Sequence, residues 1–120
     1  MNQNIDNFKR GTAELLVLYL LSQEDLYGYQ ITQAFAQKSE GVYTMLEGSL
    51  YPILYRLTDA GYISDYVVPA GKRRTRRYYH LEEKGQEYLK EILADYDAIT
   101  DSISKILDRK EGKSGDGAAK

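Results

Sequence analysis

The sequence predicts a mainly α-helical fold with one small β-hairpin and a long C-terminal helix. Three observations predict it. Three segments within the first 62 residues carry apolar side chains in helical patterns. Two short segments rich in Tyr, Val and Ile follow, separated by a Pro-Ala-Gly break at residues 69–71. From residue 89 onward, apolar residues recur at alternating spacings of three and four, which is the pattern of a coiled-coil helix.

Length and composition exclude several classes of protein. A chain of 120 residues, 42% hydrophobic and 28% charged, fits one globular domain with a modest core. Without cysteine it has no disulfide and no zinc-thiolate site, and one histidine, His80, cannot build a multi-histidine metal site. The apolar run at residues 15–21 is far shorter than the roughly 20 residues that span a bilayer. We therefore expect a cytoplasmic protein that is not an enzyme, crosses no membrane and uses no cofactor.

The first expected helix begins near Gly11 and Thr12 and runs to residue 22. Its sequence, AELLVLYLLS after Thr12, is apolar on nearly the whole circumference. A helix that is apolar all round must be covered all round. One side is expected to pack on the core of its own domain and the other on a second molecule.

The second expected helix, at residues 28–38, is short and one-sided. Gly28 can open it, and Ile31, Ala34 and Phe35 form a single buried stripe. Residues 39–48 are expected to form a connection with a brief extended piece at residues 42–45.

The third expected helix, at residues 49–61, has the clearest boundaries. Ser49 is expected as its N-cap, which puts Pro52 at the third helical position, where a missing N–H costs nothing. Gly61 is expected to close the helix in the left-handed conformation. The buried stripe comprises Leu50, Ile53, Leu54 and Leu57, and the opposite face carries Tyr51, Tyr55, Arg56 and Thr58. That face suits an ordinary surface helix as well as a binding surface.

The hairpin, with strands at residues 62–68 and 75–81, carries a cluster of positive charge. Five of the six residues 72–77 are Lys or Arg. The chain has 16 Lys and Arg against 18 Asp and Glu, so without these five the balance is 11 against 18, or −7. A focused basic patch on an acidic body suits a polyanion, although a basic run alone can also be a solvated loop.

The order of these elements decides between the two interpretations. A pair of helices, a capped third helix and a hairpin with a cationic tip form a winged helix-turn-helix, whose third helix enters the major groove of DNA while the wing reaches the neighbouring backbone. Guanidinium groups such as those of Arg73, Arg74 and Arg76 match phosphate oxygens. Residues 1–81 are therefore expected to be a DNA-binding domain.

The last expected helix, at residues 82–110, requires a partner. Its apolar seam comprises Leu89, Ile92, Tyr96, Ile99, Ile103 and Ile106. No other segment is long enough to pair with this seam, so a second copy of the chain is expected, although the helix could also fold back on its own domain. The tail at residues 111–120 is polar and glycine-rich and is expected to be disordered.

The sequence resembles the PadR-like family of transcriptional regulators over nearly its whole length before the tail. The resemblance rests on GTAELLVLYLL, YGYQI, EGSLYPILYRLTDAGYI and RRYYHLEEKG, in that order. It implies a homodimeric repressor of the short subfamily that binds a palindromic operator and pairs its last helix with the first helix of the partner. In some relatives a phenolic acid or a drug releases the DNA.

We assign the expected functional residues by role. The expected DNA-binding residues are Tyr27, Tyr29, Ser49, Tyr51, Pro52, Tyr55, Arg56, Lys72, Arg73, Arg74, Arg76 and Arg77. An aromatic effector is expected between Leu15, Leu18, Tyr19, Ile92, Tyr96 and Ile99. Dimerisation is expected through Leu16 and the six seam residues. The alternative for Tyr96 is that it only packs in the seam.

The chain departs from the family pattern at two places. Glu82 stands where the family has a threonine that caps the last helix, so the start of that helix is expected to fray. Drug-sensing relatives have a tryptophan where this chain has Tyr96 and an acidic residue where it has Thr100. A smaller aromatic ligand than in those relatives, or none, is therefore expected.

Two other classes of function remain to be weighed. A winged-helix module that binds protein would keep its affinity at high salt, whereas phosphate contacts weaken steeply as salt rises. An enzyme would need a paired acid and base or a metal site, and the sequence offers neither.

Overall fold

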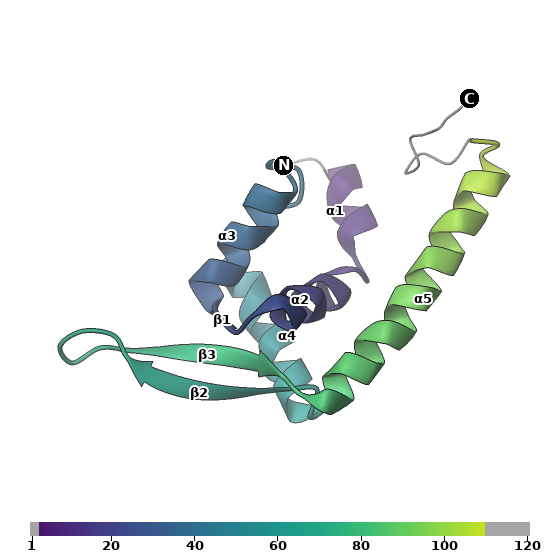
Figure 1. Cartoon of the computed structure of the whole chain (residues 1–120). Coiled ribbons are helices and arrows are strands. Elements are labelled where there is room, and N and C mark those ends of the chain that lie inside the picture. The colour runs from purple at the N-terminus through teal and green to yellow at the C-terminus, as the bar shows by residue number, and fades with distance from the viewer. Residues whose placement is uncertain (1–2, 110–120) are drawn as a thin grey trace. The chain divides into compact units, whose positions relative to one another are not determined.

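The computed structural model describes residues 3–109, and the predicted tail lies outside them. The elements in chain order are α1 (Gln3–Lys9), α2 (Ala13–Gln23), β1 (Leu26–Tyr27), α3 (Gly28–Lys38), α4 (Glu47–Asp59), β2 (Ile63–Pro69), β3 (Thr75–Leu81) and α5 (Glu83–Ile106). The chain divides into two compact units after Leu89. The first unit holds the three core helices and the hairpin, which projects away from them (Figure 1). The mainly α-helical fold with a hairpin is confirmed.

The core of the first unit lies between α2, α3, α4 and the inner face of the sheet. α3 and α4 contribute residues of their predicted apolar stripes. The most deeply buried side chains are Val17, Leu18, Ile31, Leu50, Leu54, Leu57 and Ile63. α2 is buried at five positions instead of one stripe, as its apolar circumference predicts.

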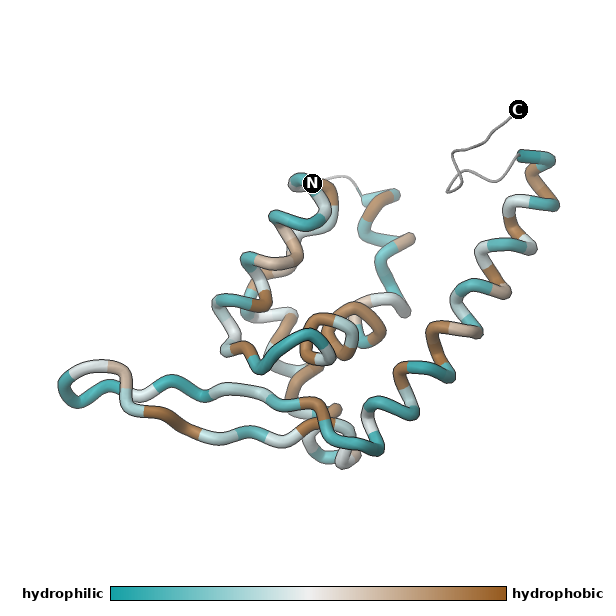
Figure 2. Tube along the Cα trace, in the orientation of Figure 1, coloured by the Kyte–Doolittle hydropathy of each residue, from teal (hydrophilic) through white to brown (hydrophobic). Residues whose placement is uncertain are grey.

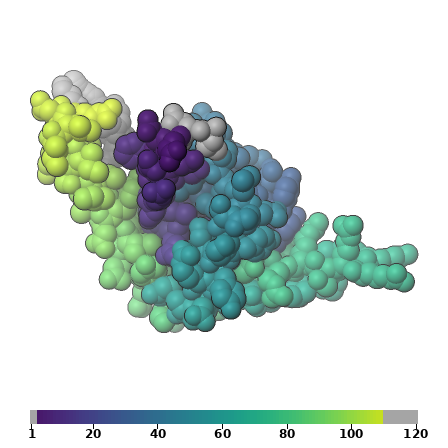
Figure 3. Space-filling view, turned by 180° about the vertical axis from the view of Figure 1, so that it is seen from behind, coloured from purple at the N-terminus to yellow at the C-terminus, as the bar shows by residue number. Residues whose placement is uncertain are grey.

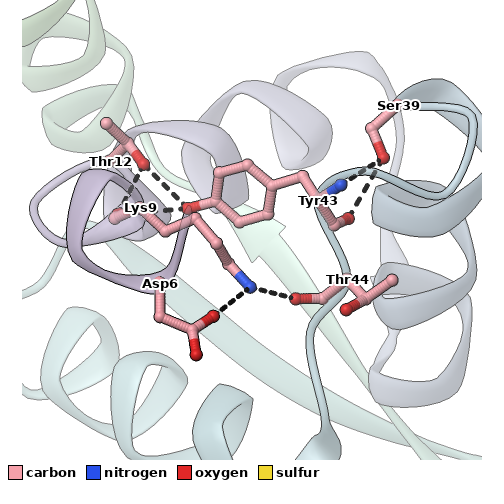
Figure 4. A network of polar contacts seen from close by, with 6 residues as sticks. All are labelled: Asp6, Lys9, Thr12, Ser39, Tyr43 and Thr44. Atoms are coloured by element: carbon pink, nitrogen blue, oxygen red, sulfur yellow. Dashed lines mark hydrogen bonds and ion pairs between the residues drawn. The ribbon is translucent and has the colours of Figure 1, made fainter. Parts of the chain in front are cut away.

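α1 was not predicted, and a network of polar contacts fixes it to the connection between α3 and α4 (Figure 4). Lys9 Nζ donates to the carbonyl of Thr44 over 2.9 Å and pairs with Asp6 at 3.6 Å. The Tyr43 hydroxyl lies 2.7 Å from Thr12 Oγ1 and donates to the carbonyl of Lys9. Burial raises the pKa of Tyr43, so its hydroxyl keeps the proton that these contacts use.

The connection at residues 39–46 has no strand, so the extended piece expected at residues 42–45 is wrong. The backbone N–H groups of Val42 and Tyr43 bond to Ser39, one to its carbonyl and one to Oγ. These bonds close a turn, and the backbone has no strand to pair with in this place.

The N-cap of α4 is Leu46, three residues earlier than predicted, so the assignment of Ser49 as N-cap is wrong. The N–H groups of Ser49 and Leu50 both donate to the carbonyl of Leu46, which starts the helix at Glu47. Pro52 consequently stands at the sixth helical position, where its ring removes one hydrogen bond near the helix start. The sequence did not reveal this start, because Leu46 caps the helix without a side-chain hydrogen bond. Only backbone groups close the first turn.

The end of α4 agrees with the prediction. Gly61 has φ of +84°, and its N–H donates to the carbonyl of Thr58 while that of Tyr62 donates to the carbonyl of Leu57. These two bonds form a Schellman motif, in which a glycine adopts the left-handed conformation without strain. The chain is thereby turned from α4 directly into β2.

The predicted hairpin is confirmed, and a third strand joins it. β3 pairs antiparallel with β2 and with the two-residue β1, in the order β1-β3-β2. Tyr79 and Leu81 point to the helices and are buried. Tyr78 belongs to the other face, where its ring contacts Tyr27 of β1 and stacks on Tyr66 of β2.

The first two turns of α5 are packed on the turn after α4. A Cβ added to Gly85 would collide with the carbonyl of Tyr62, so only glycine permits this approach. The rings of Tyr62 and Tyr88 stack with centroids 4.3 Å apart, and Lys84 Nζ donates to the carbonyl of Ala60. Glu82 accepts a hydrogen bond from Ser64, which holds the chain just before α5 begins.

Beyond Leu89, α5 continues as the second unit with its apolar seam uncovered. Brown segments recur along the helix in Figure 2. Tyr96 is 41% exposed, Ile99 56%, Ile103 46% and Ile106 81%. Exposed side chains of this size in a regular stripe are the mark of a surface that another helix covers.

Candidate nucleic-acid interface

The outward face of α4 carries the predicted groove-facing residues. Tyr55 is 77% exposed, and Ser49 and Pro52 are also exposed. Opposite them, Ile53 and its apolar neighbours pack into the core. The face offers a phenol and a hydroxyl as hydrogen-bonding groups, both of which can reach base edges in a major groove.

Tyr51 lies at the edge of this face against α3. Its ring approaches the start of α3 so closely that a Cβ added to Gly28 would overlap the Tyr51 hydroxyl. The phenol is still 45% exposed. Gly28 therefore opens α3, as predicted, and also makes room for a side chain of α4.

Arg56 is engaged by the protein itself. Its Nε donates to Glu14 Oε2 over 2.9 Å, and its Nη2 donates to the same oxygen. The ion pair joins α4 to the first turn of α2. Sequence reasoning placed Arg56 on the exposed side, which is correct, but missed its partner.

The tip of the hairpin holds three cations without partners. Residues 70–74 close the turn through a 2.9 Å hydrogen bond from Ala70 N–H to the carbonyl of Arg74. Lys72, Arg73 and Arg74 are all exposed, and none has an ion pair or hydrogen bond through its side chain within residues 3–109. Arg73 has φ of +57°, an unfavourable conformation for a residue other than glycine.

The remaining two cations of the cluster are held against the hairpin. The guanidinium of Arg76 lies 4.6 Å from the ring centroid of Tyr27, and Arg77 pairs with Asp65 across the strands at 3.3 Å. The alternation of side chains along β3 sends them to opposite faces. The five basic residues are therefore three free cations and two that stabilise the wing.

The base of the wing is tied to the turn before β1. Asp25 accepts a hydrogen bond from the Tyr66 hydroxyl at 2.6 Å and contacts His80 Nδ1 at 2.8 Å. Partial burial opposes ionisation of Asp25, but these hydrogen bonds outweigh it, so the pKa of Asp25 lies below its ordinary value. The same carboxylate raises the pKa of Tyr66.

The two tyrosines expected at the start of α3 differ in accessibility. Tyr29 is 56% exposed. Tyr27 is half-buried between Tyr78 and Arg76, and its N–H donates to the side chain of Gln30. Tyr29 is free to reach a partner, whereas Tyr27 belongs to the packing of the sheet.

The residues expected around an effector are not all accessible. Leu15 is 6% exposed and Leu18 is fully buried, so both belong to the core of their own domain and their assignment to a ligand cleft is corrected. Tyr19, at 44% exposed, and the half-buried Leu16 remain on the open side of α2.

No other kind of site emerges in the described part of the chain. Among residues 3–109, no three His, Asp or Glu side chains come together to hold a metal ion. Within the same residues, no helix has the length and apolar character needed to cross a membrane.

The sequence matches a known family and a characterised relative. The model of the transcriptional regulator PadR-like family matches residues 17–91. The negative transcriptional regulator PadR of Bacillus subtilis is 28% identical over 87 residues, which cover 72% of this chain and 48% of PadR. The chain thus spans about half the length of that relative.

Two solved structures extend the comparison to the fold. A PadR family transcriptional regulator from Eggerthella lenta superposes with a TM-score of 0.79 at 27% identity, over 90% of this chain and 92% of the other. PadR of Bacillus subtilis in complex with operator DNA superposes with a TM-score of 0.64 at 28% identity, over 71% of this chain and 48% of PadR.

Proposed function

The chain belongs to the PadR-like family of transcriptional regulators, and on that basis we propose that it binds double-stranded operator DNA as a homodimer and represses transcription. We assign DNA binding to residues 1–81 and dimerisation to residues 82–110. The protein would act in the cytoplasm, together with the DNA that it controls.

The observation that carries the proposal is the combination of a free cationic wing tip with the outward face of α4. Lys72, Arg73 and Arg74 have no partner within the described residues, whereas Arg77 pairs with Asp65 and Arg76 lies over the ring of Tyr27. Tyr55 presents a phenol on the neighbouring helix. Cations suit the phosphate backbone, and a polar aromatic side chain suits base edges.

The uncovered seam of α5 supports the homodimer. A second copy supplies a matching apolar stripe and two linked reading helices, which a palindromic operator requires. The half-buried Leu16 on the open side of α2 offers a further apolar contact for a partner.

Selection of bound fragments from genomic DNA, followed by binding assays on the recovered site, tests the proposal. We expect a palindromic sequence, binding by a dimer, and weaker binding when either half-site is scrambled. Affinity that is unchanged between 50 and 200 mM salt would contradict it, because a protein that touches six phosphates binds roughly 10³-fold more weakly at the higher concentration. That result would favour a protein-binding module instead.

The proposal includes release of the DNA by a small aromatic effector at Tyr96. The accessible Tyr19, Tyr96 and Ile99 support it, since they leave aromatic and apolar surface free to contact a ligand. A ligand that induces transcription must bind the DNA-free form more tightly. Calorimetry with planar phenolic acids and cationic aromatic drugs, with Tyr96→Ala as the control, tests this part. If Tyr96→Ala binds these ligands as tightly as the wild type does, or if the folded wild-type dimer binds none of them, Tyr96 only packs in the seam.

A further inference from the structure

The junction between α1 and α2 brings a second cationic point to the side of α4. A hollow of about 510 Å³ lies between them. It is lined from the junction side by Asp6, Lys9, Arg10 and Ala13, and from the other side by Tyr43, Thr44, Met45, Leu46, Ser49 and Ile53. Arg10 thus shares one hollow with Ser49, which lies on the first turn of α4.

The junction is held in place by contacts from both sides. Lys9 and Thr12, which flank Arg10 and Gly11, are both tied to the connection before α4, through the carbonyl of Thr44 and the hydroxyl of Tyr43 (Figure 4). The N–H of Thr12 also donates to the carbonyl of Lys9, which closes a turn around Arg10. Arg10 therefore extends from a backbone fixed relative to α4.

The charges around the hollow leave Arg10 unneutralised. Lys9 is engaged by Asp6, and Arg56 on the same flank of α4 is engaged by Glu14. Arg10 is exposed, and its side chain has no partner within residues 3–109. With two cations and one carboxylate lining it, the hollow carries a net positive charge.

The segment that leads into Arg10 lies on the other side of α4 from the wing. Seen from behind, α4 lies between the purple α1 and the green hairpin (Figure 3). A helix in the major groove has a phosphate backbone on each side of it. The wing tip can meet the backbone on one side, and the α1–α2 junction lies toward the other.

We propose that Arg10 contacts a backbone phosphate on the side of the recognition helix opposite the wing, so that α4 is held in the groove between two cationic points. This inference rests on the proposed DNA-binding function. The phosphate is reached next to Ser49, on the side of α4 that Arg10 and Ser49 share. Because the contact is to a phosphate, it adds affinity on every sequence and no base preference.

The test compares Arg10→Gln, Arg10→Lys, Arg73→Gln and Lys38→Gln on a random-sequence duplex at several salt concentrations. Lys38 is the matched control because it is exposed and unpaired within residues 3–109 but lines a different hollow, with Leu16 and Tyr19. We expect Arg10→Gln to flatten the slope of log affinity against log salt by about 0.9 for each phosphate that it no longer neutralises. Arg10→Lys and Lys38→Gln should keep the wild-type slope, and urea unfolding should show that all variants remain folded.

The outcomes separate this inference from the function on which it rests. If Arg10→Gln keeps the wild-type slope while Arg73→Gln flattens it, Arg10 does not touch a phosphate and the inference fails, but the DNA-binding function stands. If the wild-type protein shows no salt-dependent binding to DNA, the proposed function fails. An equal flattening in Lys38→Gln would show that only overall charge matters, and would also overturn the specific role of Arg10.

Discussion

Two nitrogens of the Arg56 guanidinium donate to one carboxylate oxygen of Glu14, 42 positions earlier in the chain. The helical pattern of α4 predicts that Arg56 is exposed, and it is, but no local pattern reveals a partner on α2. An arginine occupied in this way has fewer donors left for a base. We therefore expect Arg56 to position α4 and to leave base reading to Tyr51 and Tyr55.

A double-mutant cycle with Arg56→Gln and Glu14→Gln tests this role. We expect a coupling of about 0.5 kcal/mol in the free energy of unfolding, because the pair is solvent-exposed. Arg56→Gln should weaken binding to operator and random DNA by the same factor, whereas Tyr55→Ala should weaken operator binding by a further ~1 to 3 kcal/mol. If Arg56→Gln weakens binding to the operator but not to random DNA, Arg56 contacts a base and this expectation is wrong.

Asp25 is a second residue whose role depends on distant partners, since Tyr66 and His80 both contact it. Its pKa is lower in the folded protein than the ordinary 3.8. The carboxylate therefore contributes stability that is fully present above pH 3.8 and is lost as the pH falls through the folded pKa.

Asp25→Asn should consequently lower the free energy of unfolding at pH 7 by about 1 kcal/mol, a value reduced for the partial exposure of the group. The difference from wild type should shrink below pH 3.8. Urea titrations at about pH 7, 4 and 2.5 measure it, with the exposed Glu24→Gln as the control. A difference that stays constant down to the most acidic point would show that the charge of Asp25 is not what holds the wing.

At the scale of elements, the sequence predicts what depends on local pattern. The stripes of α3 and α4, the Gly61 cap and the two hairpin strands all follow from spacing and turn residues. What it misses depends on tertiary contact. The two residues of β1 are a strand only because β3 lies beside them, and α1 is fixed by Lys9 and by Tyr43 from a distant connection. The start of α4 was misplaced because a serine is a good N-cap in general, while here the backbone closes the turn at Leu46.

In the candidate site, too, the sequence predicts the features that depend on local pattern and misses those that depend on tertiary contact. Residue type and order predict a basic wing and an aromatic helix face, and the structure shows both as exposed surfaces, with α4 packed against β2 of the wing. The sequence does not show which of the basic residues have partners. Arg76 lies over the ring of Tyr27 and Arg77 pairs with Asp65, whereas the side chains of residues 72–74 have no partner within residues 3–109. Arg10 was missed because a single arginine near the N-terminus gives no sequence signal.

The wing should therefore have two kinds of basic residue that salt dependence can separate. Replacing Lys72, Arg73 and Arg74 together by glutamine should reduce the salt slope by about 0.9 for each phosphate left without its cation, with little effect on stability. The matched double variant Arg76→Gln, Arg77→Gln should keep most of the slope and lower the thermal midpoint. Equal flattening of the slope per charge in both variants would contradict the division.

The junction between β3 and α5 depends on one close approach, which two alanine substitutions can isolate. Gly85→Ala should destabilise the fold by about 1 to 3 kcal/mol, because the new Cβ would overlap the carbonyl of Tyr62. Gly48→Ala, in a helix with nothing within 4 Å of the new atom, should stabilise it by roughly 0.5 to 1 kcal/mol. Thermal unfolding measures both, and a stabilising Gly85→Ala would show that α5 does not dock here as described.

At the scale of the whole molecule, the seam of α5 is an apolar surface that a single chain leaves exposed to solvent. Ile99, Ile103 and Ile106 are exposed in the single chain, and Ile106 is 81% exposed. The spacing of these residues was readable from the sequence because a coiled-coil pattern is purely local. The length of the helix also led us to expect a second copy of the chain as its partner, and this stays a prediction, since the structure describes one copy.

Placing charges on the seam should separate the proposed dimer into monomers. Ile99→Glu with Ile103→Glu should lower the sedimentation coefficient to that of a monomer and weaken operator binding by about 100-fold or more, because linked half-sites gain roughly 10² to 10⁴ from effective concentration. The matched control, Ala94→Glu with Ala98→Glu, adds the same charges to another side of the helix and should remain dimeric. A seam variant that stays a dimer would place the interface elsewhere.

Two backbone hydrogen bonds close the tip of the wing, and its three cations make no side-chain ion pair or hydrogen bond within residues 3–109, which has a consequence for evolution. Under the proposed function, substitutions at these positions would change how strongly the protein holds any DNA, while the core, α4 and the seam would stay unaltered. Single mutations at the tip can therefore raise or lower the occupancy of a promoter without lowering the stability of the fold. Regulators with this architecture can acquire a new threshold of response before they acquire a new target sequence.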